Sequence, residues 1–149
     1  MPTHYPGTEE EIRALNTYIK LSRAAESVSN RVNAHLREHH LTISQFGVLE
    51  ALYHLGPLPS GELGTKILKS SGNMTLVLDN LEKRTLIIRQ RRADDRRSVE
   101  IHLTEQGSAL VAEIIPSHVA GIVQAFGALT PAEQEQMAEL CKTLGLANS

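Results

Sequence analysis

Cysteine and large aromatic residues are scarce in this chain of 149 residues. It holds a single cysteine, Cys141, so an intrachain disulfide is excluded and no disulfide framework supports a secreted scaffold. Tryptophan is absent, and the chain has only two Phe and three Tyr. Its core must therefore be built from Leu, Ile, Val and Ala, which is typical of packed helices.

Long apolar segments are also lacking. No apolar run approaches the roughly 18 to 20 residues that cross a bilayer. The N-terminal sequence MPTHYPGTEEE has no basic-then-apolar leader pattern. Apolar residues nonetheless make up 41% of the chain and charged residues 21%, as in ordinary globular proteins. We therefore expect a soluble, cytoplasmic protein with no membrane partner, long enough for one domain plus extensions.

Positive charge is in no excess over the whole chain, whose net charge is -2, but it is concentrated in one segment. Residues 60–103 hold nine Lys/Arg against six Asp/Glu, and residues 83–97 hold seven against two. A basic stripe on an acidic body is the electrostatic footprint of a polyanion binder. A solvated charged hairpin has the same composition, so charge alone leaves both interpretations open.

Apolar residues spaced by three and four predict a mainly helical fold. A capping box at Thr8 and Glu11 precedes such a pattern over about residues 9–39, which predicts one long helix. A second capping box begins at Thr42 and opens a short helix that ends at Gly56.

Two more short helices are expected between residues 60 and 84. Ser60 is the expected cap of the first, and Ser70 or Ser71 that of the second. The apolar residues of the second helix share one face, and they are Met74, Val77, Leu78 and Leu81.

After residue 84 the apolar period changes to two. Leu86 and Ile88, and later Val99, Ile101 and Leu103, alternate with polar residues. This pattern predicts two short strands, joined by RRADDRR at 91–97 into a β-hairpin. Two further helices are expected to begin at Thr104 and Thr130.

This order divides the chain into three parts: an N-terminal helix (1–40), a compact middle (41–104) and C-terminal helices (105–149). The flanking helices cannot bury their apolar faces on so small a middle segment. We therefore expect residues 1–40 and 105–149 to pack together, and against a second copy, as a dimerisation region.

Three short helices followed by a hairpin form a winged helix-turn-helix. The segments LTISQFGVLEAL, SSGNMTLVLDNLEKR and DDRRSVEIHLTEQG stand here at matching spacing. With them the chain resembles the MarR family of bacterial transcription regulators over nearly its whole length, and most of all the branch linked to aromatic and quinone compounds. The resemblance implies a mainly α fold with a β-hairpin wing, and a homodimer that binds double-stranded DNA at an inverted repeat, repression being the commoner mode.

Helical geometry selects the residues opposite the apolar face of the fourth helix. A recognition helix enters the major groove with its N-terminus first. We expect Ser71, Asn73 and Thr75 to bond base edges, and Leu76 to contact a thymine methyl group. The residues suited to phosphates are Ser70 at the start of the helix, and Lys83 and Arg84 at its far end.

By the same resemblance, the hairpin is a wing whose tip enters the minor groove. The D-x-R tip of the family matches Asp95 and Arg97, which makes Arg97 the inserted side chain and Asp95 the support of the loop. Phosphate contacts are expected from Arg89, Arg91, Arg92 and Arg96. The family usually has Gly after the recognition helix. Because this chain has Thr85, we expect that turn to close differently.

Regulation by a small aromatic effector is implied by the resemblance, which puts such ligands between the helical region and the winged domain. The candidates for contacting it are Tyr18, His39, Tyr53 and His54. A regulator without any ligand also fits. Tyr18 occupies the place of the cysteine of peroxide-sensing members, and Cys141, among apolar residues, is expected to be buried and structural.

Three alternatives remain. The spacing of His35 and His39, with His40 beside them, suits zinc and a metal-responsive regulator, but no further ligand stands at motif spacing, so no metal or other cofactor is expected. A winged helix can also be a protein-interaction module without specific DNA binding. An enzyme is disfavoured because no phosphate loop, nucleophile arrangement or paired carboxylates are recognisable.

Overall fold

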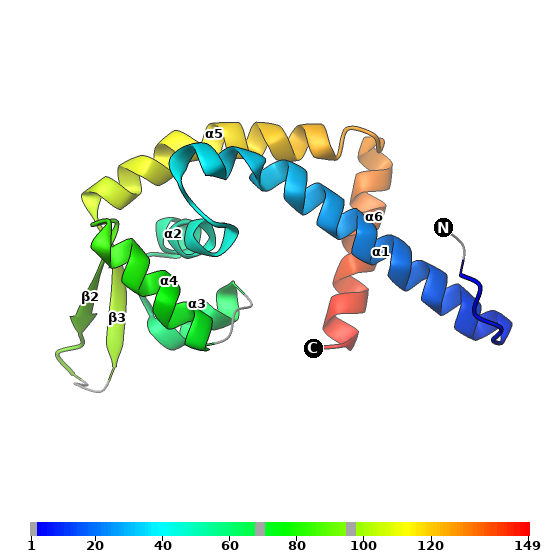
Figure 1. Cartoon of the computed structure of the whole chain (residues 1–149), viewed down its shortest axis with the longest axis horizontal. Helices are drawn as coiled ribbons and strands as arrows, with labels where there is room; N and C mark the ends of the chain where they lie inside the picture. Colours follow the sequence, from blue (N-terminus) through cyan, green and yellow to red (C-terminus); the bar gives the residue numbers. More distant parts are fainter. Residues whose placement is uncertain (1–2, 68–70, 95–97) are drawn as a thin grey trace. The chain divides into compact units, whose positions relative to one another are not determined.

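The computed structural model describes residues 3–67, 71–94 and 98–149. In chain order the elements are α1 (Glu9–Asn33), a 3-10 helix η1 (Ala34–His39), α2 (Ile43–Leu55), β1 (Leu58–Pro59), α3 (Ser60–Lys66), α4 (Ser71–Lys83), β2 (Ile87–Arg91), β3 (Val99–Leu103), α5 (Glu105–Ala125) and α6 (Pro131–Ala147) (Figure 1). The predicted fold class, mainly α with a small β-hairpin, is confirmed.

Two compact units make up the chain. Residues 35–118 form one, called here the winged-helix unit. The other, called the helical unit, combines the residues before 35 with residues 119–149. The winged-helix unit contains the middle segment 41–104, residues 35–39 of η1 and the first two-thirds of α5.

The helix starts follow the sequence closely. The capping boxes of α1 and α2 are present: the hydroxyl of Thr8 accepts from the Glu11 N–H (3.2 Å) and that of Thr42 from the Gln45 N–H (3.1 Å). A third box, at Thr130, opens α6. The prediction for Ser60 is wrong, because the cap of α3 is Pro59 at the end of β1 and Ser60 is already helical.

The predicted helix over 9–39 changes character before its end. Its α-helical part stops at Asn33, and residues 34–39 continue as the narrower η1. His40 follows with a positive φ of 55°, which turns the chain into α2. The period-3.6 pattern cannot distinguish the two helix types over so short a stretch.

The sheet contains the predicted hairpin and one strand that was not predicted. β2 and β3 pair antiparallel with Ile87 opposite Leu103, and β1 adds Leu58 opposite Ile101. Ile87 is fully buried, whereas Ile88 is 42% exposed. The predicted phase of the first strand is therefore wrong by one residue, since Leu86 is buried in the turn before the strand.

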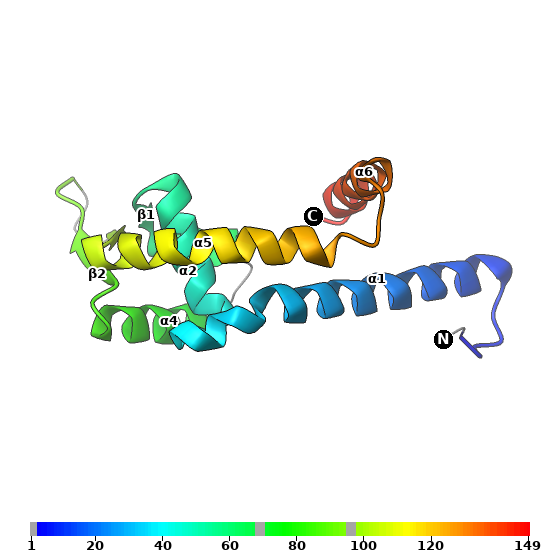
Figure 2. The ribbon, with the colours of Figure 1, turned by 90° about the horizontal axis from the view of Figure 1, so that it is seen from above.

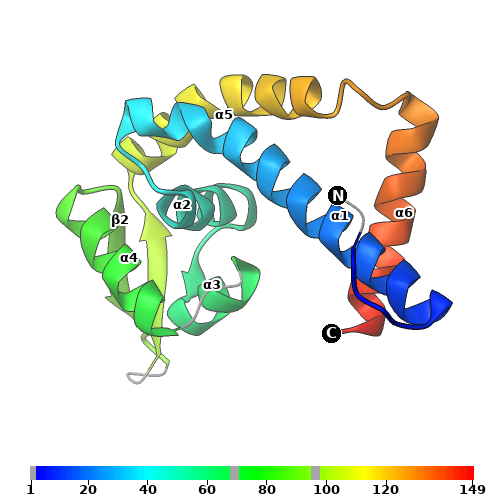
Figure 3. The same cartoon turned by 45° about the vertical axis from the view of Figure 1, so that its right-hand side comes forward.

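One apolar core holds the winged-helix unit together. Its fully buried side chains are Leu36, Val48, Leu49, Leu63, Leu81, Ile87, Ile101, Val111 and Ile114. They come from η1, α2, α3, α4, β2, β3 and α5. Figure 3 shows the ribbons of α2, α3, α4 and β2, which lie side by side in this unit. This shared core fixes α4 against the hairpin.

By length and composition alone, α5 is long and apolar enough to cross a membrane. Polar residues such as Glu113 and Gln124 interrupt the apolar residues of α5, so this helix contains no unbroken apolar run of the length considered in the sequence. Figure 2 shows α5 as one continuous helix. Pro116 lies within it. Its buried residues Val111 and Ile114 belong to the winged-helix core.

Candidate nucleic-acid interface

The fourth helix has one buried side and one exposed side, as its sequence predicts. Met74, Leu78 and Leu81 are at most 4% exposed and pack into the core. Asn73 and Thr75 are exposed. An apolar residue, Leu76, also stands among them at 63% exposure. The helix therefore presents amide, hydroxyl and methyl groups together, the combination that reads base edges and thymine methyl groups in a major groove.

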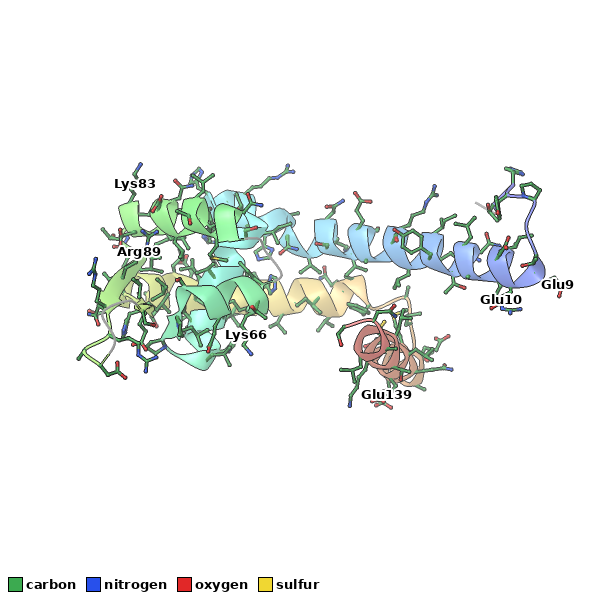
Figure 4. The ribbon with its side chains drawn as sticks, turned by 90° about the horizontal axis from the view of Figure 1, so that it is seen from below. Glu9, Glu10, Lys66, Lys83, Arg89 and Glu139 are labelled. Atoms are coloured by element: carbon green, nitrogen blue, oxygen red, sulfur yellow. The ribbon has the colours of Figure 1, made fainter. Side chains whose placement is uncertain are left out.

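Two residues predicted to contact DNA at the start of this helix, Ser70 and Ser71, cannot be fully placed. α4 begins at Ser71, whose side chain lies outside the described residues, as does Ser70. At the far end Lys83 is exposed and points away from the helix (Figure 4). Lys83 therefore has the freedom that a phosphate contact requires.

The turn after α4 closes as a Schellman motif. Leu86 N–H donates to Leu81 O (3.0 Å), and Thr85 N–H donates to Glu82 O (2.9 Å). Thr85 has a φ of 59°, in the left-handed region that glycine usually fills. The prediction that this turn must close differently is wrong. Thr85 takes up the glycine conformation, and its hydroxyl donates to Gln106 Oε1 (2.7 Å).

Arg84 is engaged within the protein. Its guanidinium donates to the carbonyl oxygens of His40 (2.8 Å) and His39 (3.1 Å), at the end of η1. These acceptors are the orphan carbonyls of a helix end, which an arginine stabilises. The side chain predicted to bind phosphate thus already ties the end of α4 to η1.

Arg89 is likewise engaged. Its Nη2 lies 2.7 Å from Asp79 Oδ1 on α4, in an ion pair whose side chains are 29% and 47% exposed. Its Nε is buried without a partner among the described residues. Of the three wing arginines that the structure describes, Arg89 is therefore the one that faces the protein interior.

The outer wing carries the exposed charge. Arg91 is exposed, and Arg92 lies 3.4 Å from Asp94 in an exposed ion pair. The Arg92 N–H donates to Ser98 O (3.1 Å), which extends the hairpin beyond the strands. The predicted wing tip, which is Asp95, Arg96 and Arg97, lies outside the described residues.

Comparison with known proteins identifies the family to which a chain with this helix and hairpin belongs. The sequence profile of the MarR family matches residues 41–99, from just before α2 to the first residue of β3. The HTH-type transcriptional regulator MhqR of Bacillus subtilis is 40% identical over 134 residues, which span 90% of this chain and 92% of that protein. This chain belongs to the MarR family.

Solved structures agree in fold. BpsR of Bordetella bronchiseptica, studied for the regulation of its DNA binding by 6-hydroxynicotinic acid, aligns with a TM-score of 0.80 at 27% identity, over 87% of this chain and 98% of that one. MepR of S. aureus, solved with DNA, aligns with a TM-score of 0.75 at 25% identity, over 87% and 96%. The MarR protein described here is thus a DNA-binding transcription regulator with a winged helix, and not an enzyme.

The four residues expected near an effector are not brought into one group by the described contacts of this MarR chain. Tyr53 and His54 touch each other edge-to-face (5.4 Å between ring centroids), and Tyr53 is 40% exposed. His39 is half-buried in η1. Tyr18 belongs to the helical unit, where it is 66% exposed.

A group of rings that sequence reasoning missed lies in the winged-helix unit. The His118 ring centroid is 5.3 Å from that of His35 and 4.9 Å from that of Phe46. His35 Nε2 and His118 Nδ1 are buried without a hydrogen-bond partner among the described residues. Burial lowers the pKa of His118, Glu50 partly offsets this, and His35 lowers it further. We call His35, Phe46, Glu50 and His118 the histidine cluster.

Sequence spacing could have revealed part of this cluster. Val111, Ile114 and His118 follow at intervals of three and four, which places a histidine on the buried face of α5. Its partners come from η1 and α2, which no local pattern connects. His35 and His39 lie in a 3-10 helix, so they lose the α-helical spacing that a zinc pair needs. No group of three or more His, Cys, Asp or Glu suited to a metal occurs in the described ranges.

In the helical unit, the expectation for the cysteine is wrong. Cys141 is exposed, because its α6 face meets a groove rather than a core. This groove, of about 870 Å³, is lined by both α1 and α6 and includes Tyr18, Leu21, Cys141 and Leu144. Apolar spacing along α6 correctly marks a face that is suited to packing, but the single chain does not cover it.

Proposed function

We propose that this MarR protein is a cytoplasmic homodimeric repressor that reads an inverted-repeat operator. The observation that carries the proposal is the exposed face of α4, on which Asn73, Thr75 and Leu76 stand opposite a buried apolar side. Lys83 and Arg91 supply exposed positive charge on α4 and β2 of the same unit. Base-reading groups beside phosphate-binding cations fit duplex DNA.

Dimerisation is supported by apolar surface on the helical unit. On the helices of this unit the exposed large apolar residues are Tyr18, Leu21, Val119, Ile122, Val123, Met137, Leu140, Leu144 and Leu146. So many exposed apolar side chains on the flanking helices favour a protein partner, and a second copy is the simplest one. A twofold dimer pairs two α4 helices, so we expect half-sites about one helical turn apart.

The predicted wing contacts complete the proposal. Arg97 is proposed to enter the minor groove, with Asp95 supporting the loop and Arg91 and Arg96 on phosphates. Ser70 and Ser71 are proposed to hold the phosphate and the base edge at the start of α4. Arg84 is the weakest member of the predicted set, since leaving the carbonyls of η1 would cost it two hydrogen bonds.

Selection of bound duplexes from a random DNA library tests this function. Enrichment of an inverted repeat, with affinity that falls steeply as salt rises, is the expected result. If no sequence is enriched and duplexes bind weakly at all salt concentrations, the result favours the alternative that the winged helix is a protein-interaction module. Repeating the selection with candidate ligands separates that alternative from a regulator that needs its effector to bind.

A small aromatic effector is proposed to release the DNA. The histidine cluster favours it, because two buried ring nitrogens, of His35 and His118, lack partners among the described residues, and the His118 ring lies beside that of Phe46. A hydroxyl or carboxylate on an aromatic ring would satisfy such nitrogens. BpsR, whose DNA binding is regulated by 6-hydroxynicotinic acid, is a precedent of that chemistry. The predicted contacts Tyr18, His39, Tyr53 and His54 remain candidates.

Titration of hydroxylated aromatic acids and phenols into the protein–DNA complex tests the effector. We expect one class to release the duplex, and His118→Phe to need far more of the same compound. Equal release from His118→Phe and the unchanged protein would remove the histidine cluster from the response. Tyr53→Phe, on the exposed side of α2, serves as the comparison variant for the other candidates.

A further inference from the structure

We propose that Arg89 is a positioning residue that fixes the wing to the recognition helix through Asp79, and not a phosphate ligand. Its charge and its place at the start of the wing suggest a DNA contact. Its Nη2 is instead 2.7 Å from Asp79 Oδ1. Arg89 belongs to β2 and Asp79 to α4, so the ion pair joins the two elements that address adjacent grooves.

The sheet register turns Arg89 toward the protein. Arg89 pairs with Ile101, which is fully buried, while its neighbour Ile88 is exposed. Side chains opposite each other across a pair of strands point to the same face of the sheet, and successive ones alternate. Arg89 therefore projects from the core-facing side of β2, where it meets α4.

The Arg89–Asp79 ion pair lies close to a residue that is proposed to contact DNA bases. Arg89 lines a cleft of about 760 Å³ whose walls come from α3, α4 and the sheet, and which also includes Thr75 and Ile101. Asp79 stands one helical turn after Thr75 on α4 (i, i+4). A shift at Asp79 therefore moves the turn that carries a proposed base contact. In Figure 4, Arg89 is drawn beside α4.

Other ionic links do not duplicate this one in the described part of the chain. The Arg92–Asp94 and His102–Glu100 pairs both lie within the hairpin. Arg89–Asp79 is the described ion pair that connects the hairpin to α4. Since the Arg89 Nε is buried, the side chain has little freedom to turn outward to a phosphate.

The direction in which one substitution changes the affinity for DNA separates the two roles of Arg89. Asp79→Asn removes a negative charge from α4. If Arg89 binds phosphate, the substitution frees that arginine and makes the surface more positive, so DNA binding strengthens or stays constant. If Arg89 positions the wing, the same substitution loosens it, and binding to the enriched duplex weakens by roughly tenfold, as for a lost charged hydrogen bond.

The experiment measures the affinity of four proteins for the duplex found by selection, at several salt concentrations. They are the unchanged protein, Asp79→Asn, Arg89→Gln and the double variant, with Arg91→Gln as the matched control on the same strand. Arg91→Gln should reduce the salt slope by about one. Both single variants at the pair should lose affinity with the slope unchanged, and the double variant should lose no more than either.

Amide hydrogen exchange without DNA gives a second readout that does not depend on the proposed operator. Exchange across 87–91 should accelerate several-fold in Asp79→Asn and in Arg89→Gln, and remain unchanged in Arg91→Gln. Unchanged exchange in the first two, or tighter DNA binding by Asp79→Asn, would overturn the positioning role. If the unchanged protein enriches no duplex, the proposed function fails while the exchange result still decides the role of Arg89.

Discussion

Replacing Gly107 with alanine should destabilise the winged-helix unit, although alanine is the better helix former. An added Cβ at Gly107 would stand 2.2 Å from Leu86 O and 2.9 Å from Leu103 Cδ1. Leu86 O cannot simply move away, because it accepts from the Thr104 N–H (3.1 Å). The Thr104 hydroxyl in turn accepts from the Gly107 N–H (2.9 Å), so the start of α5 is fixed on both sides.

The expected change in the free energy of unfolding of Gly107→Ala is the sum of opposing contributions. Alanine in a helix gains about 1 kcal/mol over glycine. Overpacking against a backbone atom costs about 1 to 3 kcal/mol, and disturbing the Thr104 cap and its neighbouring hydrogen bond costs about 1 kcal/mol each. The net expected loss in the free energy of unfolding is about 2 to 4 kcal/mol, a large part of the roughly 5 to 15 kcal/mol of a typical domain.

Urea unfolding followed by circular dichroism, at one fixed protein concentration, measures this loss. Gly61→Ala is the matched control, since Gly61 also lies in a helix of the winged-helix unit and no atom of the described residues stands within 4 Å of its added Cβ. We expect the control to be neutral or slightly stabilising. If Gly107→Ala proves as stable as Gly61→Ala, the close approach of α5 to the turn after α4 is not a constraint, and the reasoning is refuted.

Four further changes follow from the same structure. Thr85→Gly should stabilise the fold by roughly 0.5 to 1 kcal/mol by relieving the left-handed strain, whereas Thr85→Ala should destabilise it, and urea unfolding decides. Burial lowers the pKa of His118, so the full stability of the fold is present above the ordinary histidine pKa, near 6.5, where this side chain is neutral. The free energy of unfolding should fall as the pH decreases through the lowered pKa, and it should fall less in His118→Gln. Unfolding of both proteins at pH 7.5 and 5.5 measures this difference. Asn73→Ala should relax base preference more than it lowers non-specific affinity, and an equal loss on all duplexes would make Asn73 a positioning contact. Arg97→Ala should weaken binding strongly with the dimer intact, and unchanged affinity would remove the wing tip from the mechanism.

Local chemistry allowed much of this fold to be predicted from the sequence. Capping boxes fix where helices begin through contacts three residues apart, so Thr8, Thr42 and Thr130 were identified correctly. The buried face of α4 followed from a single periodicity. Such features depend on neighbours in the chain, which the sequence contains in full.

The wrong predictions concern features that depend on contacts between residues far apart in the sequence. Thr85 adopts a left-handed conformation because Gln106 and Thr104, about 20 residues away, hold its side chain and carbonyl. That turn moves the inward position of the first strand from Ile88 to Ile87. Arg89 resembles every other wing arginine until the register places it opposite Ile101.

In the candidate sites, too, features set by local spacing could be predicted, whereas features set by distant contacts could not. The exposed positions of α4 could be read from the helical period, whereas the histidine cluster joins residues as distant as His35 and His118. The burial expected for Cys141 fails in the single chain because the α6 face is left without a cover. Packing of a second copy on that face would satisfy the same apolar pattern.

Binding of the full chain to the selected inverted repeat, compared with the same duplex after one half-site is scrambled, tests the central claim most directly. A dimeric reader should bind the intact repeat at least a hundredfold more tightly, equivalent to about 2.7 kcal/mol, with two chains per duplex and a steep salt dependence. Equal affinity for both duplexes, or one chain per intact repeat, would contradict the proposal that paired α4 helices read DNA.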